Sequence, residues 1–256
     1  MEQKNVIIFG DLPIATKVAE WILNQEQLKL VACVVSGKSV HNNDPWNDVP
    51  LLRDFCEKKD IKVIEDMDEL LQLEERLDLG LSCRFAKFIN KKVLKSFSVG
   101  IVNLHGGLLP EFGGLYSCNF SILMGNGIGG GTIHWMDEKI DTGNIIRRCE
   151  FEILPEDTAY DVFQKTQVTL YDNLIELILP IANGEAVESI SQKNMLEQGF
   201  VHKYFDKNSI FDYKEINAND DEETILKKVR AFDFPGYEPA FMMINGKKVY
   251  MRLSSD

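Results

Sequence analysis

The chain has 256 residues, of which 45% are hydrophobic and 27% charged, and its formal net charge is −12 at pH 7. The length is enough for one α/β domain with a small appendage, and the composition is that of an ordinary soluble globular protein. No apolar stretch is long enough to span a bilayer. The acidic balance disfavours a nucleic-acid partner, because phosphate backbones bind to basic surfaces. The N-terminal MEQKNVIIFG is unlike a signal peptide, and five scattered cysteines without C-x-x-C spacing favour reduced thiols, so we expect a cytoplasmic location without a membrane partner.

Apolar runs alternate with amphipathic segments along the first 184 residues. We expect strands at 5–10, 28–36, 61–64, 77–83, 99–104, 132–136 and 144–153, and helices at 14–23, 49–58, 67–73, 115–124 and 158–179, with a short helix before 99. The polar, turn-rich segment Gly37 to Asp48 predicts a loop, and Pro180 should stop the last helix. Strands alternating with helices predict an α/β fold: a mostly parallel, Rossmann-like sheet with helices on both faces.

The pattern changes after Gly184. Residues 185–221 are polar and irregular, and 222–232 are expected to form a helix. Two strands, 240–244 and 247–253, flank Asn245-Gly246, a strong signal for a two-residue β-hairpin. The chain therefore divides into a larger part, 1–184, and a C-terminal extension, 185–256, with a helix and a hairpin.

A glycine-rich stretch, Gly125 to Gly130, matches the dinucleotide pattern G-x-G-x-x-G literally. That pattern binds a dinucleotide when it follows a strand and opens a helix. Here it follows a predicted helix and precedes a predicted strand, so we interpret it as a turn. The first strand ends in Gly10-Asp11-Leu12-Pro13, which is too poor in glycine to cradle a pyrophosphate.

Polar residues lie at the carboxyl ends of two predicted parallel strands, where open α/β sheets bind their ligands. These segments are Ser82-Cys83-Arg84 and Asn103-Leu104-His105. Residues two apart on a strand point to the same side, so Asn103 and His105 can face one reacting atom. A carboxylate from another strand end could orient the imidazole. An amide, an imidazole and a carboxylate suit acyl transfer to an amine, in which an oxyanion must be stabilised.

The stretches VNLHGGLLPEFGG and GGTIHWMDEKIDTGNII resemble the core of the folate-dependent formyltransferases, and among them the nucleotide-sugar N-formyltransferases, relatives of methionyl-tRNA formyltransferase. The family signature is Asn-x-His, a downstream Leu-Leu-Pro and an Asp in a D-x-G-type loop. These positions fall at Asn103, His105 and Asp141. The resemblance is strong over residues 80–150 and weaker over most of the chain.

The resemblance implies transfer of a formyl group from N10-formyltetrahydrofolate, without a metal. Asn103 would donate to the formyl oxygen as it becomes an oxyanion, His105 would take the proton from the attacking amine, and Asp141 would hold the imidazole. The folate would contact Phe85, Phe88, Ile89, Asp137 and Ile140. The acceptor would contact Arg84, Gly106, Gly107, Tyr116 and Tyr237. From the residues alone, Asp141-Thr142-Gly143 also fits a simple turn, His134 a packing or hydrogen-bonding role, and Tyr237 either a small aromatic core or a surface that stacks on a base.

The family uses three kinds of acceptor: glycinamide ribonucleotide, methionyl-tRNA and nucleotide-linked amino sugars. The segment FGDLP does not supply the phosphate loop of the first kind of enzyme, and the chain stops before the C-terminal barrel of the second. We therefore predict a catalytic domain, 1–184, that formylates a nucleotide sugar such as a dTDP-amino-dideoxyhexose, and an extension, 185–256, that supports a homodimer.

The resemblance further implies a role in O-antigen biosynthesis. A methionyl-tRNA formyltransferase-like enzyme, a hydrolase that releases formate and a non-catalytic Rossmann-like binding protein stay open. The family commonly has Ser within the segment held here by Gly106-Gly107, and often a basic residue near Glu111. These departures concern the acceptor and not the transfer chemistry.

Overall fold

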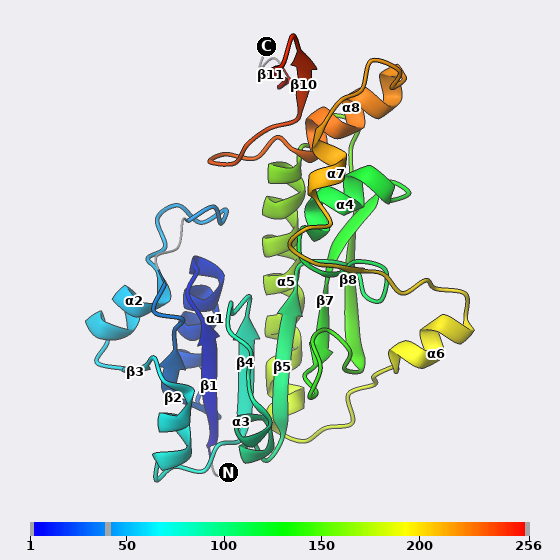
Figure 1. Cartoon of the computed structure of the whole chain (residues 1–256). Helices are drawn as coiled ribbons and strands as arrows, with labels where there is room; N and C mark the ends of the chain where they lie inside the picture. Colours follow the sequence, from blue (N-terminus) through cyan, green and yellow to red (C-terminus); the bar gives the residue numbers. More distant parts are fainter. Residues whose placement is uncertain (1–2, 39–41, 254–256) are drawn as a thin grey trace.

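A computed structural model describes residues 3–38 and 42–253, so the predicted loop 37–48 lies partly outside the described residues (Figure 1). The described chain contains a seven-stranded sheet in the order β3-β2-β1-β4-β5-β7-β8. Its strands are β1 (Lys4–Gly10), β2 (Leu28–Val34), β3 (Lys62–Ile64), β4 (Leu79–Cys83), β5 (Gly100–His105), β7 (Ile128–Trp135) and β8 (Ile145–Glu152). The first five are parallel, and β7 and β8 run antiparallel to their neighbours. The predicted α/β, mostly parallel sheet is confirmed.

Helices cover both faces of the sheet. They are α1 (Pro13–Leu23), α2 (Leu52–Lys58), the 3₁₀-helix η1 (Met67–Gln72), α3 (Lys91–Ser96), α4 (Ser117–Met124) and α5 (Ala159–Ala182). Alternate residues of β1 belong to different cores: Val6 packs with α1, α2 and α5, whereas Ile7 packs with η1 and α3. Burial on both faces explains why this strand is a continuous apolar run.

Several predicted boundaries in this part are wrong by two to four residues, among them the start of α2 and the end of β2, and two of the errors have a clear physical reason. Helix α5 does not stop at Pro180 but continues to Ala182. A proline in the last turn removes only one backbone hydrogen bond. The helix still ends with a hydrogen bond from the Asn183 N–H to the Leu179 carbonyl, at 3.0 Å. Strand β7 begins at Ile128, inside the glycine stretch predicted to be a turn. In this strand, Gly131 allows α5 to pack closely, since a Cβ at this position would lie 2.6 Å from the Leu170 side chain of that helix. The stretch follows helix α4 and leads into strand β7, the context on which the interpretation against a dinucleotide site was based.

The C-terminal extension contains more regular structure than predicted. Its elements are α6 (Gln192–Glu197), β9 (Tyr204–Phe205), α7 (Phe211–Lys214), α8 (Glu222–Ala231), β10 (Phe241–Ile244) and β11 (Lys247–Tyr250). Strand β9 pairs with β6 (Gly113–Gly114) from the larger part. The predicted hairpin is confirmed: Asn245 and Gly246 both have positive φ, as its two-residue turn requires.

A second apolar core joins the extension to the larger part. Phe205 stacks on Phe120 with ring centroids 3.7 Å apart, and Val229 and Phe232 belong to the same core. In Figure 1 α7 and α8 therefore lie against α4, whereas the hairpin β10–β11 stands at the far end of the molecule. This shared core places residues of the extension beside the ends of β4 and β5.

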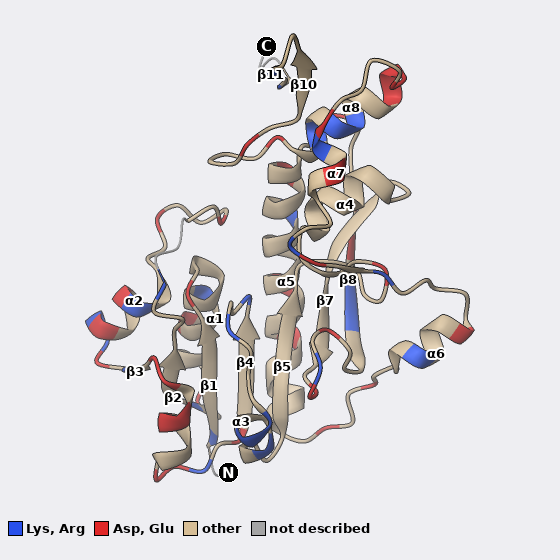
Figure 2. Cartoon of the chain, in the orientation of Figure 1, with Lys and Arg blue, Asp and Glu red and all other residues tan. Residues whose placement is uncertain are grey.

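Charged residues lie mainly on outer helices and loops, and the central strands β1, β4 and β5 carry almost none (Figure 2). None of the helices within residues 3–38 and 42–253 is long and apolar enough to cross a membrane. The same residues contain no group of three or more His, Cys, Asp and Glu side chains arranged to hold a metal ion.

Candidate active site

Strand β5 carries Asn103 and His105 to the carboxyl edge of the sheet. In the register of β5 and β7, Asn103 lies opposite His134 and His105 lies opposite Thr132. His105 is buried, with 7% of the residue exposed, while Asn103 is partly exposed. The two predicted site residues therefore stand on one side of one strand, as the spacing predicted.

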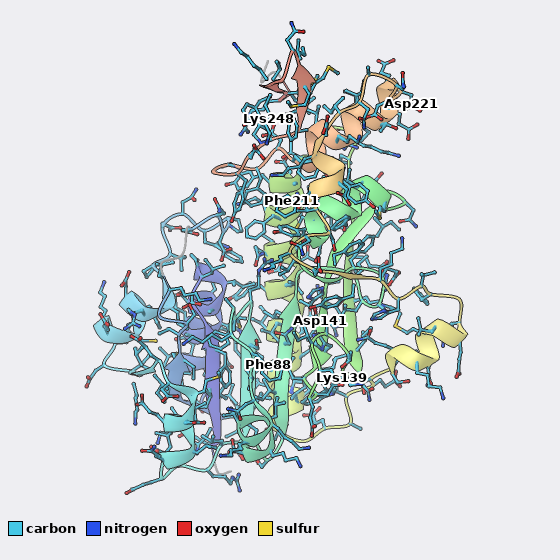
Figure 3. All side chains as sticks on the ribbon, in the orientation of Figure 1. Phe88, Lys139, Asp141, Phe211, Asp221 and Lys248 are labelled. Carbon is cyan, nitrogen blue, oxygen red and sulfur yellow. The ribbon has the colours of Figure 1, made fainter. Side chains whose placement is uncertain are left out.

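Asp141 reaches this edge from the turn between β7 and β8. It has a positive φ of 55°, and its Oδ1 lies 3.5 Å from His105 Nδ1. Its Oδ2 accepts a hydrogen bond from the Gly114 backbone N–H at 2.9 Å. The structure thus brings the three predicted residues together, with Asp141 near the centre of the molecule (Figure 3).

Both ring nitrogens of His105 face oxygen atoms. Nε2 donates to the Phe112 carbonyl at 2.7 Å, which leaves Nδ1 on the side of the Asp141 carboxylate. A neutral ring with its proton on Nε2 can accept a second proton at Nδ1. The Asp141 carboxylate would then face an N–H and stabilise the charged ring.

His134 is a further member of the site, and of the two roles left open for it, packing or hydrogen bonding, the structure shows hydrogen bonding. Its Nδ1 donates to the Trp135 carbonyl at 2.8 Å, and its Nε2 lies 3.0 Å from the Asn103 amide nitrogen. Burial, and then the neighbouring His105, lower the pKa of His134 to about 4, so the ring is neutral at neutral pH and Nε2 accepts from Asn103. This bond fixes the orientation of the Asn103 amide and leaves its second N–H for a substrate oxygen. The cross-strand register, which the sequence does not reveal, creates the pair.

Gln192, from the start of α6, holds the turn that carries Asp141. Its Nε2 donates to the Asp141 carbonyl at 2.7 Å and to the Gly143 carbonyl at 3.2 Å. Gly143 is sterically required, because a Cβ would lie 1.7 Å from the Trp135 carbonyl oxygen. The pattern Asp141-Thr142-Gly143 is therefore a turn that also positions a carboxylate, and one of its supports comes from the extension.

A pocket of about 590 Å³ opens beside this triad. Its wall includes Phe211, Lys214, Phe232, Phe234, Tyr237 and Glu238 from the extension. Of the five predicted acceptor contacts, four line the pocket: Arg84, Gly106, Tyr116 and Tyr237. The fifth, Gly107, does not line it but is buried, and a Cβ there would lie 2.6 Å from both the Phe112 carbonyl oxygen and the Ser117 Cβ.

The predicted folate contacts lie mainly outside this pocket. Phe85 lines it, whereas Ile89 is 1% exposed in the core and Phe88 and Ile140 are 57% and 54% exposed. Among the described residues, no hydrogen bond uses the peptide groups of Phe88 and Ile89. Asp137 caps its own loop by accepting from the Lys139 N–H and the Thr142 hydroxyl.

Figure 3 shows Phe88 and Lys139 below Asp141, and Phe211 above it. The site thus has two sides. The side formed by Phe88 and Ile140 presents exposed apolar surface, and beside it the peptide groups of Phe88 and Ile89 form no hydrogen bond with a described residue. The other side is the pocket, which the extension completes.

A Rossmann-like sheet with an amide, an imidazole and a carboxylate at its carboxyl edge is the architecture of an acyl-transfer site. The family model "Formyl transferase" matches residues 6–178. The chain belongs to the formyl transferase family.

Among curated proteins, the methionyl-tRNA formyltransferase of Lactobacillus delbrueckii subsp. bulgaricus is 32% identical over 142 residues, which cover 56% of this chain and 43% of that protein. The enzyme of the same name from Ureaplasma parvum serovar 3 is 25% identical over 247 residues, 91% of this chain and 80% of that protein. The chain spans about half the length of the lactobacillus relatives that it matches, between 43% and 60%.

Two solved structures match over most of the length of both chains. A 4-N formyltransferase from Francisella tularensis superposes with a TM-score of 0.78 at 24% identity, covering 98% of this chain and 97% of that one, a likeness of fold. An N-formyltransferase from Helicobacter canadensis, in complex with folinic acid and dTDP-3-aminofucose, has a TM-score of 0.77 at 26% identity and covers 96% of this chain and 86% of its own.

Proposed function

We propose that this chain transfers a formyl group from N10-formyltetrahydrofolate to the amine of a nucleotide-linked amino sugar, of the dTDP-amino-dideoxyhexose kind. The observation that carries the proposal is the pocket wall supplied by the extension, beside a complete Asn103, His105 and Asp141 triad. The likeness to the Helicobacter canadensis enzyme supports it, because that likeness runs through 96% of this chain and so includes the extension.

The donor side fits a flat pterin with hydrogen-bonding edges. The peptide groups of Phe88 and Ile89 would hold the pterin edge, Asp137 would contribute its backbone, and Phe85, Phe88 and Ile140 would pack on its faces. When bound, N10-formyltetrahydrofolate supplies the activated formyl group. The described residues offer no cluster for a metal ion, and the proposed chemistry uses none.

Asn103, His105 and Asp141 each have a separate role in the transfer. The second amide N–H of Asn103 donates to the formyl oxygen as negative charge develops on it. Removal of one such donor reduces transition-state stabilisation by about 2.7–4 kcal/mol. His105 accepts the proton of the attacking amine at Nδ1, where the Asp141 carboxylate, 3.5 Å away, stabilises the charged ring. His105 then returns this proton to N10 as the bond between N10 and the formyl carbon breaks, so that the leaving group is tetrahydrofolate and the ring is neutral again.

The activity test uses purified protein, N10-formyltetrahydrofolate and a panel of nucleotide-linked 3-amino and 4-amino sugars, with uncharged and methionyl-tRNA alongside. Mass spectrometry should find one added formyl group on a sugar nucleotide. Formylation of methionyl-tRNA and of no sugar would replace the proposal with the second candidate function, that of a methionyl-tRNA formyltransferase-like enzyme. The names of the curated relatives favour this candidate. Formate release without an acceptor would indicate a hydrolase, and no reaction at all would indicate a binding protein.

The extension also supports the proposal of a homodimer. The hairpin exposes apolar side chains on both strands: Met243, Ile244, Val249 and Tyr250 are 43–52% exposed. Sedimentation equilibrium should find a dimer, and Val249→Glu should shift it towards monomer. A cytoplasmic location remains a prediction from the scattered cysteines and the N-terminal sequence. A role in O-antigen biosynthesis rests on the family resemblance and follows only if a sugar is formylated.

A further inference from the structure

Arg84 follows β4 at the carboxyl edge of the sheet and lines the pocket. Its φ is 55°, in the left-handed region that a residue with a Cβ rarely adopts. Such backbone conformations cluster at binding sites, where the surrounding structure imposes them. The position therefore holds a long cationic side chain in a fixed, unfavourable backbone conformation beside the reaction centre.

The guanidinium group of Arg84 has no polar partner among the residues that the structure describes. It forms no hydrogen bond and no ion pair with residues 3–38 and 42–253, and its Nη1 is buried. Its Cζ lies 4.9 Å from the centre of the Phe163 ring, an arrangement that holds the group in place. A buried donor without an acceptor is destabilising, so a ligand with acceptor oxygens explains the arrangement better than packing does.

Gly106 provides the space that this guanidinium occupies. A Cβ at residue 106 would lie 2.7 Å from Arg84 Nη1. Gly106 directly follows His105 in the chain, so the cation lies next to the triad without belonging to it. Any side chain at this position would displace the guanidinium from the pocket wall.

Arg84 forms no ion pair with a described carboxylate, although its positive charge acts on the buried Asp44. Burial raises the pKa of that carboxyl group, and the charge of Arg84 lowers it by a smaller amount. Asp44 is fully buried and its carboxylate accepts the Ile14 N–H at 2.8 Å, at the N-terminus of α1. It therefore occupies the helix terminus at which related folds bind phosphate, and a phosphate has to bind elsewhere. Lys214, the other cation in the pocket wall, already lies 3.4 Å from Glu238.

We propose that Arg84 binds the sugar-linked phosphate of the acceptor, and so holds the hexose with its amine facing His105. The inference rests on the proposed function. A planar guanidinium can bind two phosphate oxygens at once. In a nucleotide-linked amino sugar the phosphate and the amine are carried by different carbons of one ring. This geometry requires a cation that lies beside the triad and does not belong to it.

The experiment measures binding and turnover separately. Calorimetry determines the Kd of dTDP, UDP and inorganic pyrophosphate, and steady-state assays determine KM for the sugar nucleotide and for the formyl donor. Arg84→Gln should weaken binding of the preferred nucleoside diphosphate by about tenfold or more, the effect of losing a charge-assisted hydrogen bond. KM for the sugar should rise by a similar factor, while KM for the formyl donor stays unchanged.

Two variants and one control make the test specific. Arg84→Lys keeps the positive charge but lacks the planar guanidinium group, and it should lose less affinity than Arg84→Gln. Gly106→Ala leaves Arg84 in the chain and should reproduce the loss by displacing it. Arg53→Gln removes an arginine that pairs with Glu57 and Glu65, residues outside the pocket wall, and should change nothing. Circular dichroism and thermal melting verify that each variant is folded.

The outcomes separate this inference from the proposed function. A wild-type enzyme that formylates a sugar, with Arg84→Gln and Arg84→Lys unaffected, overturns the role of Arg84 alone. A rise confined to KM for the formyl donor also overturns it, because Arg84 would then bind a folate carboxylate. A wild-type protein that binds no nucleoside diphosphate and formylates only methionyl-tRNA removes the proposed function, and the inference with it.

Discussion

The triad and the outer pocket wall are built in opposite ways. His105 and His134 are 7% and 2% exposed, and each ring nitrogen faces a polar atom of the protein. On the wall, Phe211 and Tyr237 are 62% and 61% exposed. Tyr237 has an aromatic neighbour in Phe234, at 5.3 Å between ring centres.

This contrast indicates that different parts of the molecule serve catalysis and acceptor binding. A buried network holds the reacting groups in one geometry, because each polar atom would be destabilising without its partner. Exposed aromatic side chains can change their neighbours at little energetic cost. We infer that the triad determines the reaction and that the wall determines which acceptor is used.

The largest effect is expected at the centre of the buried network. His105→Asn removes the proton acceptor and should lower kcat by about 10²–10⁴, the usual contribution of a positioned acid or base. KM for either substrate should change little. Single-turnover kinetics measure this, and near-normal turnover would remove the role assigned to the histidine.

The second prediction concerns His134 and pH. Its pKa of about 4 in the folded protein lies below the usual 6.5, so the unfolded chain binds the extra proton more readily. The stability due to this residue is present above about pH 6.5 and is lost as the pH falls towards 4, by about 3 kcal/mol in all.

Urea unfolding at pH values between 7 and 4 measures this slope. His134→Gln, whose amide oxygen can still accept from Asn103, should flatten it. An equal slope in both proteins would assign the acid sensitivity to other groups.

The third prediction addresses the wall. Tyr237→Ala removes a ring that can stack on a nucleobase, which contributes about 1–3 kcal/mol, and should raise KM for the sugar nucleotide by about tenfold. Because Tyr237 forms no hydrogen bond with the residues of the buried network, kcat and KM for the formyl donor should stay the same. A fall in kcat alone would contradict the division between the triad and the wall.

The smallest effect is expected where the extension supports the triad. Gln192→Ala removes two hydrogen bonds to the Asp141 turn and should lower kcat by about two- to tenfold, the value of about one net hydrogen bond. Lys193→Ala is the matched control, since that neighbouring side chain is 84% exposed. Equal kinetics in the two variants would mean that the turn holds Asp141 unaided.

Much of this arrangement could be predicted because it is local. Apolar runs identified the strands of the sheet, and the two-residue spacing placed Asn103 and His105 on one side of β5. The hairpin followed from Asn245-Gly246, two residues that adopt positive φ readily. The end of α5 was missed, because the penalty for Pro180 in a last turn is small beside the burial of Ile181 and Ala182.

The sequence by itself determined the strand ends and the residues that carry the chemistry, since backbone periodicity and a local motif depend on neighbours in the chain. Tertiary structure alone decided the partners. The pairing of Asn103 with His134 depends on the register of β5 and β7, and the contact of Gln192 with the Asp141 turn spans 51 residues. The clearance that Gly106 gives to Arg84 depends on how β4 and β5 lie side by side. Such contacts are absent from any local pattern, because they exist only once the chain has packed.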